Sequence, residues 1–117
     1  MTSLHVANMK RDLQEVTGYQ GGTGKVGVRT LDTSVLAAAW RGLSFLRLES
    51  GASIGPRVLA DSEVILFVTK GRGRALAGAN WSELEPGSTL GLLKGGTLQV
   101  INDDRDPLEL VLAELGV

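Results

Sequence analysis

Cysteine is absent from the sequence, and histidine occurs once, as His5, close to the amino terminus. Without cysteine there can be no disulfide and no zinc site built on thiolates. A catalytic apparatus that uses histidine as its base needs a histidine held in place by the fold, and a residue so near a chain end does not meet that need. Chemistry based on imidazole or thiolate is therefore not expected.

Charge of one sign and long apolar runs are also lacking. The chain has 12 basic and 13 acidic residues, with no basic stripe interleaved with aromatic side chains, so nucleic acid is not an expected partner. The longest apolar stretch, residues 35–40, is far too short to cross a bilayer, and we expect no membrane partner. Residues 1–13 contain no apolar run of signal-peptide length. The sequence therefore predicts a soluble, cytoplasmic protein.

Glycine, in contrast, is abundant: 16 glycines separate short apolar runs, a pattern typical of many short strands joined by turns. Pro56, near the middle of one run, indicates an edge or bulged strand. We expect one domain over residues 1–117, with an N-terminal arm over residues 1–24 in which residues 5–17 form a short helix or an irregular segment. An all-β antiparallel fold, closed or doubly layered, is predicted. The predicted strands span residues 25–31, 44–48, 53–59, 64–70, 73–77, 89–93, 97–101 and 108–115.

Two segments carry glycine and asparagine at a distinctive spacing. The first runs from Gly51 to Gly71, and the second from Gly87 to Asn102. These spacings resemble the two signature motifs of the cupin family, and the resemblance covers about residues 44–115. It implies a small cupin-like jelly-roll barrel of two antiparallel sheets. It also implies a homodimer, because many cupins pair.

The positions at which cupins place metal ligands hold other residues here, namely Arg57, Leu59, Val64 and Leu98. Arginine stays protonated and alkyl groups have no lone pair, so none of the four is a usual ligand for a transition metal. Where the scaffold resembles the family, the metal site departs from it. We therefore expect no metal and no cofactor.

By their place in the family motifs, these four side chains point into the barrel, and strand alternation adds Leu66, Val68 and Val100. The interior is then an apolar tube with one guanidinium near its mouth. In one interpretation the tube is ordinary packed core. In another, a pocket persists and Arg57 holds the polar end of a small, mostly apolar ligand. The residues expected to line that pocket are Leu59, Val64, Leu66, Val68 and Leu98, with Trp40 either stacking on the ligand or closing one end of the core.

Three functional hypotheses follow from this interior. The first is a metal-free protein that binds a small molecule in the barrel. The second is a metal-independent cyclase or isomerase, for example in polyketide biosynthesis, which the resemblance permits; Arg57 would stabilise an enolate and Glu63 would act as base. Glu63 reaches the interior only if a bulge turns it inward, and otherwise it belongs to a solvated turn. The third is a non-catalytic structural or partner protein whose core is full.

The outer face of the strand at residues 64–70 is also apolar, because Ile65 and Phe67 alternate with the inward set. A second subunit is the simplest cover for such a face, and the alternative is that residues 1–40 fold back over it. Two further residues have expected structural roles. Asn102 is expected to bond the backbone of the turn that follows it, and Trp81 to lie on a hairpin between the two motifs.

Overall fold

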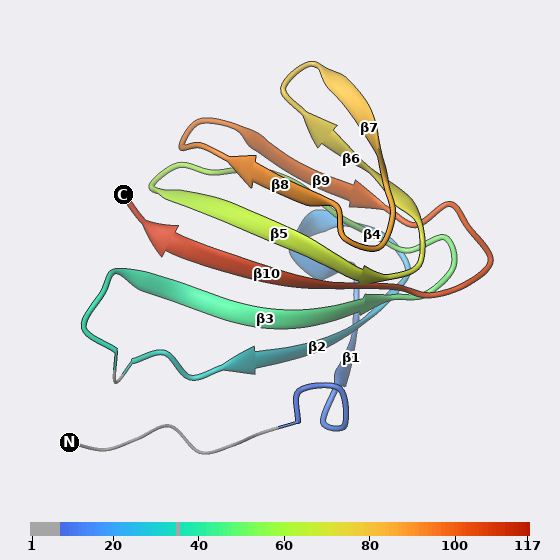
Figure 1. Ribbon diagram of the computed structural model, residues 1–117, viewed down its shortest axis with the longest axis horizontal. Coiled ribbons are helices and arrows are strands. Elements are labelled where there is room, and N and C mark those ends of the chain that lie inside the picture. Colours follow the sequence, from blue (N-terminus) through green and yellow to red (C-terminus); the bar gives the residue numbers. More distant parts are fainter. Residues whose placement is uncertain (1–7, 35) are drawn as a thin grey trace.

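The computed structural model describes residues 8–34 and 36–117, which form two antiparallel sheets (Figure 1). The six-stranded sheet has the order β1-β2-β3-β10-β5-β8, and the four-stranded sheet has the order β4-β9-β6-β7. One short 3-10 turn, η1 (Tyr19–Gly21), follows the first strand. The strands are β1 (Gln14–Thr17), β2 (Lys25–Leu31), β3 (Trp40–Leu48), β4 (Ser53–Val58), β5 (Ser62–Lys70), β6 (Gly73–Ala77), β7 (Asn80–Leu84), β8 (Thr89–Leu92), β9 (Thr97–Ile101) and β10 (Leu108–Gly116).

The predicted all-β, two-sheet architecture is confirmed. All eight predicted strands are present, and those at residues 25–31, 73–77 and 97–101 have the predicted bounds. The interpretation of Pro56 is also confirmed, because β4 is an edge strand whose pairing with β9 shifts between Ile54 and Arg57. Trp81 lies on the β6–β7 hairpin between the two motifs, as expected.

The sequence does not predict β1 and β7. Every residue of β1 and all but one of β7 are exposed, so neither strand shows the apolar alternation by which strands are recognised. The helix considered for residues 5–17 is wrong where the structure describes them, because residues 9–11 form a turn and residues 14–17 form β1. His5 and Val35 lie outside the described residues. Within residues 8–34 and 36–117, no helix is long and apolar enough to span a bilayer.

The core lies between the two sheets and is built from aliphatic side chains on alternate positions of each strand. Leu46 of β3, Leu66 of β5 and Leu110 of β10 are fully buried at its centre. Burying a side chain of this size contributes about 1.5–3 kcal/mol. This layer holds the strands that carry the polar groups of the candidate site.

Candidate functional site

The inner face of the six-stranded sheet changes from apolar to polar along its strands. On β10 the inward positions Leu108, Leu110 and Leu112 are buried, and the next inward position is Glu114. The register places Glu114 beside Val64 of β5 and Gly42 of β3. The same change occurs on the neighbouring strands. There the inward apolar side chains give way to Ser62 on β5, Ser44 on β3 and Thr30 on β2. One end of the barrel interior is therefore polar, and we call it the polar end.

Arg57 reaches the polar end because of a β-bulge. Ile54 pairs with Val100 and Arg57 pairs with Leu98, so β4 has one more residue than β9 between the two pairs. The extra residue shifts the alternation, and Arg57 rather than Val58 turns inward, leaving Val58 exposed. Gly55 makes the bulge possible, because its φ is +74° and an added Cβ would lie 2.2 Å from the carbonyl oxygen of Leu98.

Arg57 is held by two side chains of the polar end. One Nη donates a hydrogen bond of 2.8 Å to Oε1 of Glu114 and one of 3.1 Å to Oε1 of Gln20, and the other Nη bonds the second oxygen of Glu114. This is the two-point geometry in which arginine binds a carboxylate most firmly. The hydrogen bonds from Arg57 hold the pKa of Glu114 below its ordinary value, against the opposing effect of burial. The same bonds raise the pKa of Arg57.

A pocket of about 180 Å³ opens beside this ion pair. Its floor includes Leu112, and the hydroxyls of Thr30 and Ser44 lie 2.9 Å apart on its wall. The pocket could hold roughly six water molecules, at about 30 Å³ each. Its lining residues are Tyr19, Gln20, Thr30, Arg41, Gly42, Ser44, Leu112 and Glu114.

The segment that supplies Tyr19 and Gln20 is fixed against β4 by glycine. An added Cβ at Gly22 would lie 1.9 Å from the carbonyl oxygen of Ser53, so the two backbones approach too closely for any other residue. The Thr23 amide donates a 2.9 Å hydrogen bond to the Ser53 hydroxyl. Gln20 has φ 50° and ψ 42°, a left-handed conformation that non-glycine residues rarely adopt and that is enriched at functional sites. The segment thus holds two polar side chains over the polar end.

A second β-bulge positions Arg41, which lines the pocket. Glu114 pairs with Gly42 and Leu115 pairs with Trp40, so Arg41 has no partner across the ladder. Its guanidinium lies 3.4 Å from a carboxylate oxygen of Asp61. Bulges are found beside active sites because they re-aim a side chain. Both arginines at the polar end thus owe their direction to a bulge: Arg41 is the extra residue of one, and Arg57 follows the other.

The four cupin ligand positions do not offer a metal site. Leu59, Val64 and Leu98 are buried side chains without a donor atom, and Arg57 is committed to Glu114. Among the described residues, no group of three or more His, Cys, Asp or Glu side chains could hold a metal ion. The donor set therefore does not fit the transition metal that the fold family implies.

The side chains predicted to line an apolar pocket are inside the barrel. Leu59, Leu66, Val68 and Leu98 are 0% exposed and Val64 is 1% exposed, so all five are shielded from bulk solvent. Their burial agrees with the expected direction, while their role in ligand binding stays a prediction. Trp40 is half-buried at the start of β3 and is not among the residues that line the pocket.

Glu63 lies in strand β5. The expectation that it belongs to a solvated turn is therefore wrong. The register between β5 and β10 is continuous from Leu110 to Gly116, so no bulge turns Glu63 toward the interior. It alternates with the buried Ser62 and Val64 and belongs to the outer face. The carboxylate at the polar end is instead Glu114, which is not among the residues predicted from the sequence. Alternation from Leu108, Leu110 and Leu112 is the signal that could have found it.

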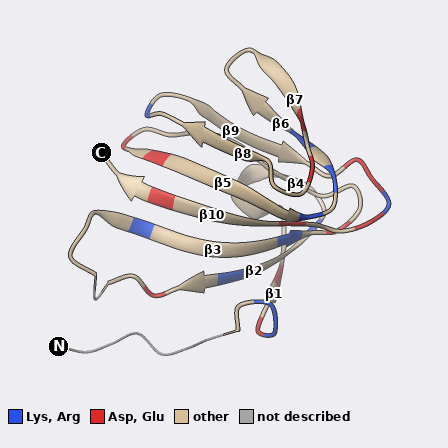
Figure 2. Cartoon of the chain, in the orientation of Figure 1, with Lys and Arg blue, Asp and Glu red and all other residues tan. Residues whose placement is uncertain are grey.

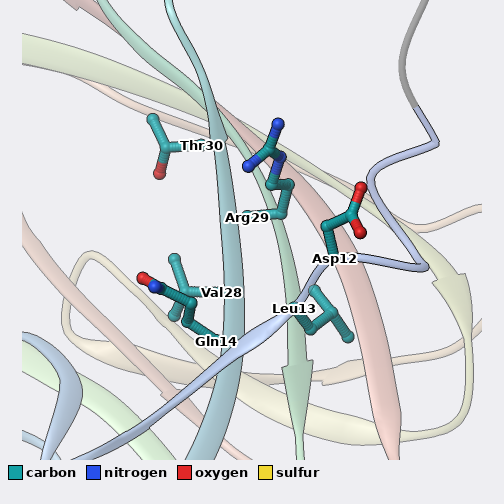
Figure 3. Close-up of a pocket in the computed structure, with 6 residues that line it drawn as sticks. All are labelled: Asp12, Leu13, Gln14, Val28, Arg29 and Thr30. Atoms are coloured by element: carbon teal, nitrogen blue, oxygen red, sulfur yellow. The ribbon is translucent and has the colours of Figure 1, made fainter.

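Tyr19, Gln20 and Arg41 are likewise not among the residues predicted from the sequence. The periodicity of the sequence gives no signal for them, because η1 is too short to be recognised and Arg41 owes its position to a bulge. A larger and more open groove, of about 610 Å³, lies between residues 12–14 and β2. In Figure 3, Val28, Thr30 and Gln14 lie on one side of β2, and Arg29, Asp12 and Leu13 lie on the other. This groove has no side-chain pair comparable to that of Arg57 and Glu114.

No protein-family model matches the sequence, and no curated protein matches it. Solved structures do resemble the fold. A protein described as a predicted oxalate decarboxylase from Thermotoga maritima has a TM-score of 0.90 and 16% identity, over 97% of this chain and 100% of that one. A cupin 2 conserved barrel domain protein from Salinispora arenicola has a TM-score of 0.76 and 14% identity, over 99% and 92% of the two chains.

A sugar phosphate isomerase of the cupin superfamily from Silicibacter pomeroyi is a third similar structure. Its TM-score is 0.68 at 18% identity, over 79% of this chain and 60% of that one. The resemblance to cupins drawn from the glycine spacing is therefore confirmed for the fold. At these identities the likeness concerns the arrangement of strands, and it carries no ligand or reaction across.

Proposed function

We propose that this cupin-fold chain is a metal-free binding protein that takes a small molecule at the polar end, with Arg57 beside the ligand's polar group. The observation that carries the proposal is the half-buried Arg57–Glu114 pair next to a pocket of about 180 Å³. Ionised groups at the edge of a core are costly to keep there, and they concentrate at functional sites. Polar groups that converge on a concavity are the common mark of a ligand site.

The extent of the pocket favours a ligand with a short apolar part. Leu112 is the aliphatic side chain in the lining, whereas the deeper side chains, such as Leu66 and Leu98, are out of reach of water. A mostly apolar ligand that filled the barrel would have to displace tightly packed side chains. The burial therefore supports packed core below the pocket, and it supports binding at the rim rather than in the tube.

The chemistry of the pair favours binding over proton abstraction. Arg57 holds the pKa of Glu114 low, and a carboxylate with a lowered pKa is a weak base at neutral pH. The bidentate bond also engages both oxygens of Glu114. The alternative of a cyclase or isomerase that uses Glu63 has less support, because Glu63 lies on the outer face.

Thermal unfolding with defined probes tests the proposal. Butyrate and benzoate serve as carboxylates with a short apolar part, and glycerol and erythritol as neutral probes. A probe at ten times its Kd stabilises the folded state by about 1.4 kcal/mol, enough to raise Tm by several degrees. We expect at least one probe to do so, and we expect Arg57→Lys to remove the shift because it lacks the planar fork.

Arg72→Lys is the matched control, since Arg72 is an exposed arginine paired with Glu85 outside the pocket. Its response to each probe should equal that of the parent protein. Each probe is tested up to about 50 mM, which is 50 times a Kd of about 1 mM. If no probe changes Tm, the proposal of binding at the polar end is wrong, and the alternative of a filled core stands. A shift that persists in Arg57→Lys would place the ligand elsewhere.

A further inference from the structure

Gln20 keeps its side chain on Arg57 in spite of an unfavourable backbone conformation. With φ at 50°, it is the only non-glycine residue of positive φ within residues 8–34 and 36–117. Such a conformation costs free energy and persists only where the surroundings enforce it. The carboxamide oxygen of Gln20 accepts a 3.1 Å hydrogen bond from an Nη atom of Arg57. Departure of the carboxamide from Arg57 would therefore allow this backbone to relax.

Two glycines flank the residues that would have to move. Gly18 and Gly21 both have positive φ, and a Cβ added at either would lie 3.4 or 3.5 Å from the nearest atom, which is ordinary contact. The tight approach to β4 begins only at the next residue, Gly22. Rotation about Gly18 and Gly21 can thus move the Gln20 side chain while the rest of the segment stays on β4.

The groups beneath the Gln20 carboxamide present a donor and an acceptor side by side. The Nη atom of Arg57 that binds Gln20 also donates a 2.8 Å hydrogen bond to Oε1 of Glu114. An ionised carboxylate has about four acceptor sites, and the bidentate bond to Arg57 uses one on each oxygen. A molecule in the place of the Gln20 carboxamide therefore meets an N–H of Arg57 and an unused lone pair of Glu114.

Charges of both signs balance at this place. Arg57 is paired with Glu114. Arg41 is paired with Asp61. Figure 2 shows a basic and an acidic segment next to each other near the left ends of β3 and β10. A carboxylate in the position of the Gln20 carboxamide would share one arginine with Glu114, and two carboxylates that share a site repel each other. A neutral polar group is therefore favoured.

We propose that the ligand of the polar end carries a primary carboxamide, which displaces the Gln20 carboxamide from Arg57. This inference rests on the proposed function and names the chemical class of its ligand. The ligand's carbonyl oxygen accepts from Arg57 and its NH2 group donates to Glu114, whereas a carboxylate has no hydrogen to donate. Gln20 makes only the first of these bonds among the described residues, so the ligand gains one. A short aliphatic part lies against Leu112 in the pocket.

Three molecules of nearly equal shape separate the possible ligand classes. Butyramide has the carbonyl acceptor and the NH2 donor, methyl propyl ketone has the acceptor alone, and butyrate has acceptors and a negative charge. Titration of isotope-labelled protein, followed by NMR, gives the Kd of each. We expect butyramide to bind at least fivefold more tightly than either of the others.

The outcomes distinguish this inference from the proposed function. If butyrate or the ketone binds at the pocket and butyramide has less than a fivefold advantage, the carboxamide class is wrong and the proposed function stands. If none of the three binds and none of the earlier probes changes Tm, the proposed function fails and this inference fails with it.

The same spectra report whether Gln20 is displaced, because the chain has three glutamines. Butyramide should move the side-chain NH2 signal of Gln20, which is identified by its loss in Gln20→Ala. Gln14 and Gln99 are internal controls, since Gln14 lines the larger groove and Gln99 alternates with buried residues of β9 in the other sheet. A response of Gln14 alone would place the ligand in the larger groove and overturn the proposal.

Removal of the Gln20 side chain tests the competition directly. Gln20→Ala should raise the affinity for butyramide at least threefold, because the ligand no longer has to displace a carboxamide. Gln20→Gly, which also removes the backbone strain, should do the same and guards against a folding defect in the alanine variant. Gln99→Ala is the matched control and should bind as the parent protein does. An unchanged or lowered affinity in both Gln20 variants would show that Gln20 does not compete with the ligand.

Discussion

The two ends of the barrel interior treat polar groups in opposite ways. At the end opposite the pocket, Asn102 is fully buried and its amide nitrogen donates to the carbonyl oxygens of Leu48 and Asp106, each at 2.9 Å. Its side-chain oxygen accepts a 3.0 Å bond from the amide of Asp104. The expectation that Asn102 bonds the following turn is confirmed. This closed end satisfies its polar groups within the chain, as a structural element must.

The polar end leaves groups available to a partner. Glu114 lines the pocket, its half-buried partner Arg57 lies beside it, and the Ser62 hydroxyl is buried without a hydrogen bond in good geometry. Ser62 is still close enough to Glu114 to help lower the pKa of that carboxylate. The same strands therefore build a self-contained network at one end and an incomplete one at the other. What distinguishes a structural polar group from a functional one in this protein is therefore whether its hydrogen bonds are satisfied within the chain, not whether it is polar.

The packed layer between the two ends should show the largest response to mutation. Leu66→Ala removes a fully buried side chain, and we expect a loss of about 2–5 kcal/mol in the free energy of unfolding. Urea denaturation followed by circular dichroism measures it. Leu93→Ala is the control, because Leu93 is 75% exposed and its loss should cost at most about 0.5 kcal/mol. Equal effects for the two would mean that the layer is not tightly packed.

At the closed end, Asn102→Ala should be the next most costly change. It removes three hydrogen bonds and leaves the buried Leu48 carbonyl without this donor, so we expect a loss of about 2–3 kcal/mol. Denaturation in urea is again the measurement, with Asn80→Ala on the exposed strand β7 as the control. A loss below about 0.5 kcal/mol would remove the contrast between the two ends.

At the polar end, Glu114→Gln should cost less, about 1 kcal/mol at neutral pH, because solvent screens the half-exposed Arg57. The pKa of Glu114 lies below 4.5 in the folded state, so its contribution is present above pH 4.5 and is lost as the pH falls through the folded value. The pKa of Arg57 is raised, and its contribution persists to strongly alkaline pH. Urea titrations at pH 7 and in the acid range should therefore show a smaller acid loss in Glu114→Gln than in the parent protein.

The smallest effect is expected for Ser62→Ala, also at the polar end. Its hydroxyl makes no hydrogen bond in good geometry, so removing it should change the free energy of unfolding by about 0.5 kcal/mol or less. Denaturation in urea compares it with Asn102→Ala, the buried polar residue of the closed end. A loss as large as that of Asn102→Ala would show that Ser62 belongs to a satisfied network.

Much of the fold could be predicted because apolar runs and glycines alternate regularly along the chain. Strands β2, β6 and β9 have their predicted bounds for that reason. The exposed strands β1 and β7 could not be found, since pairing with a neighbour rather than burial creates them.

Only part of the candidate site could be predicted from the sequence. Arg57 could be placed inside from its position in a recognisable motif. The alternation of Leu108, Leu110 and Leu112 leads to Glu114, but Val111, Ala113 and Leu115 make the other face of β10 apolar as well and obscure that signal. Arg41 depends on a register shift that arises only when β3 and β10 pair. Local pattern therefore predicts the layers, and tertiary pairing decides which charged groups meet.

The bulge at Gly55 and Pro56 has an evolutionary consequence. If the same residues ran through β4 in plain two-residue alternation, Ile54, Pro56 and Val58 would share the inner face, and the isopropyl group of Val58 would take the inward direction that the Arg57 guanidinium now has. A lineage could thus gain or abolish a charged interior by gaining or losing this one backbone irregularity, with no change to the hydrophobic residues that hold the two layers together.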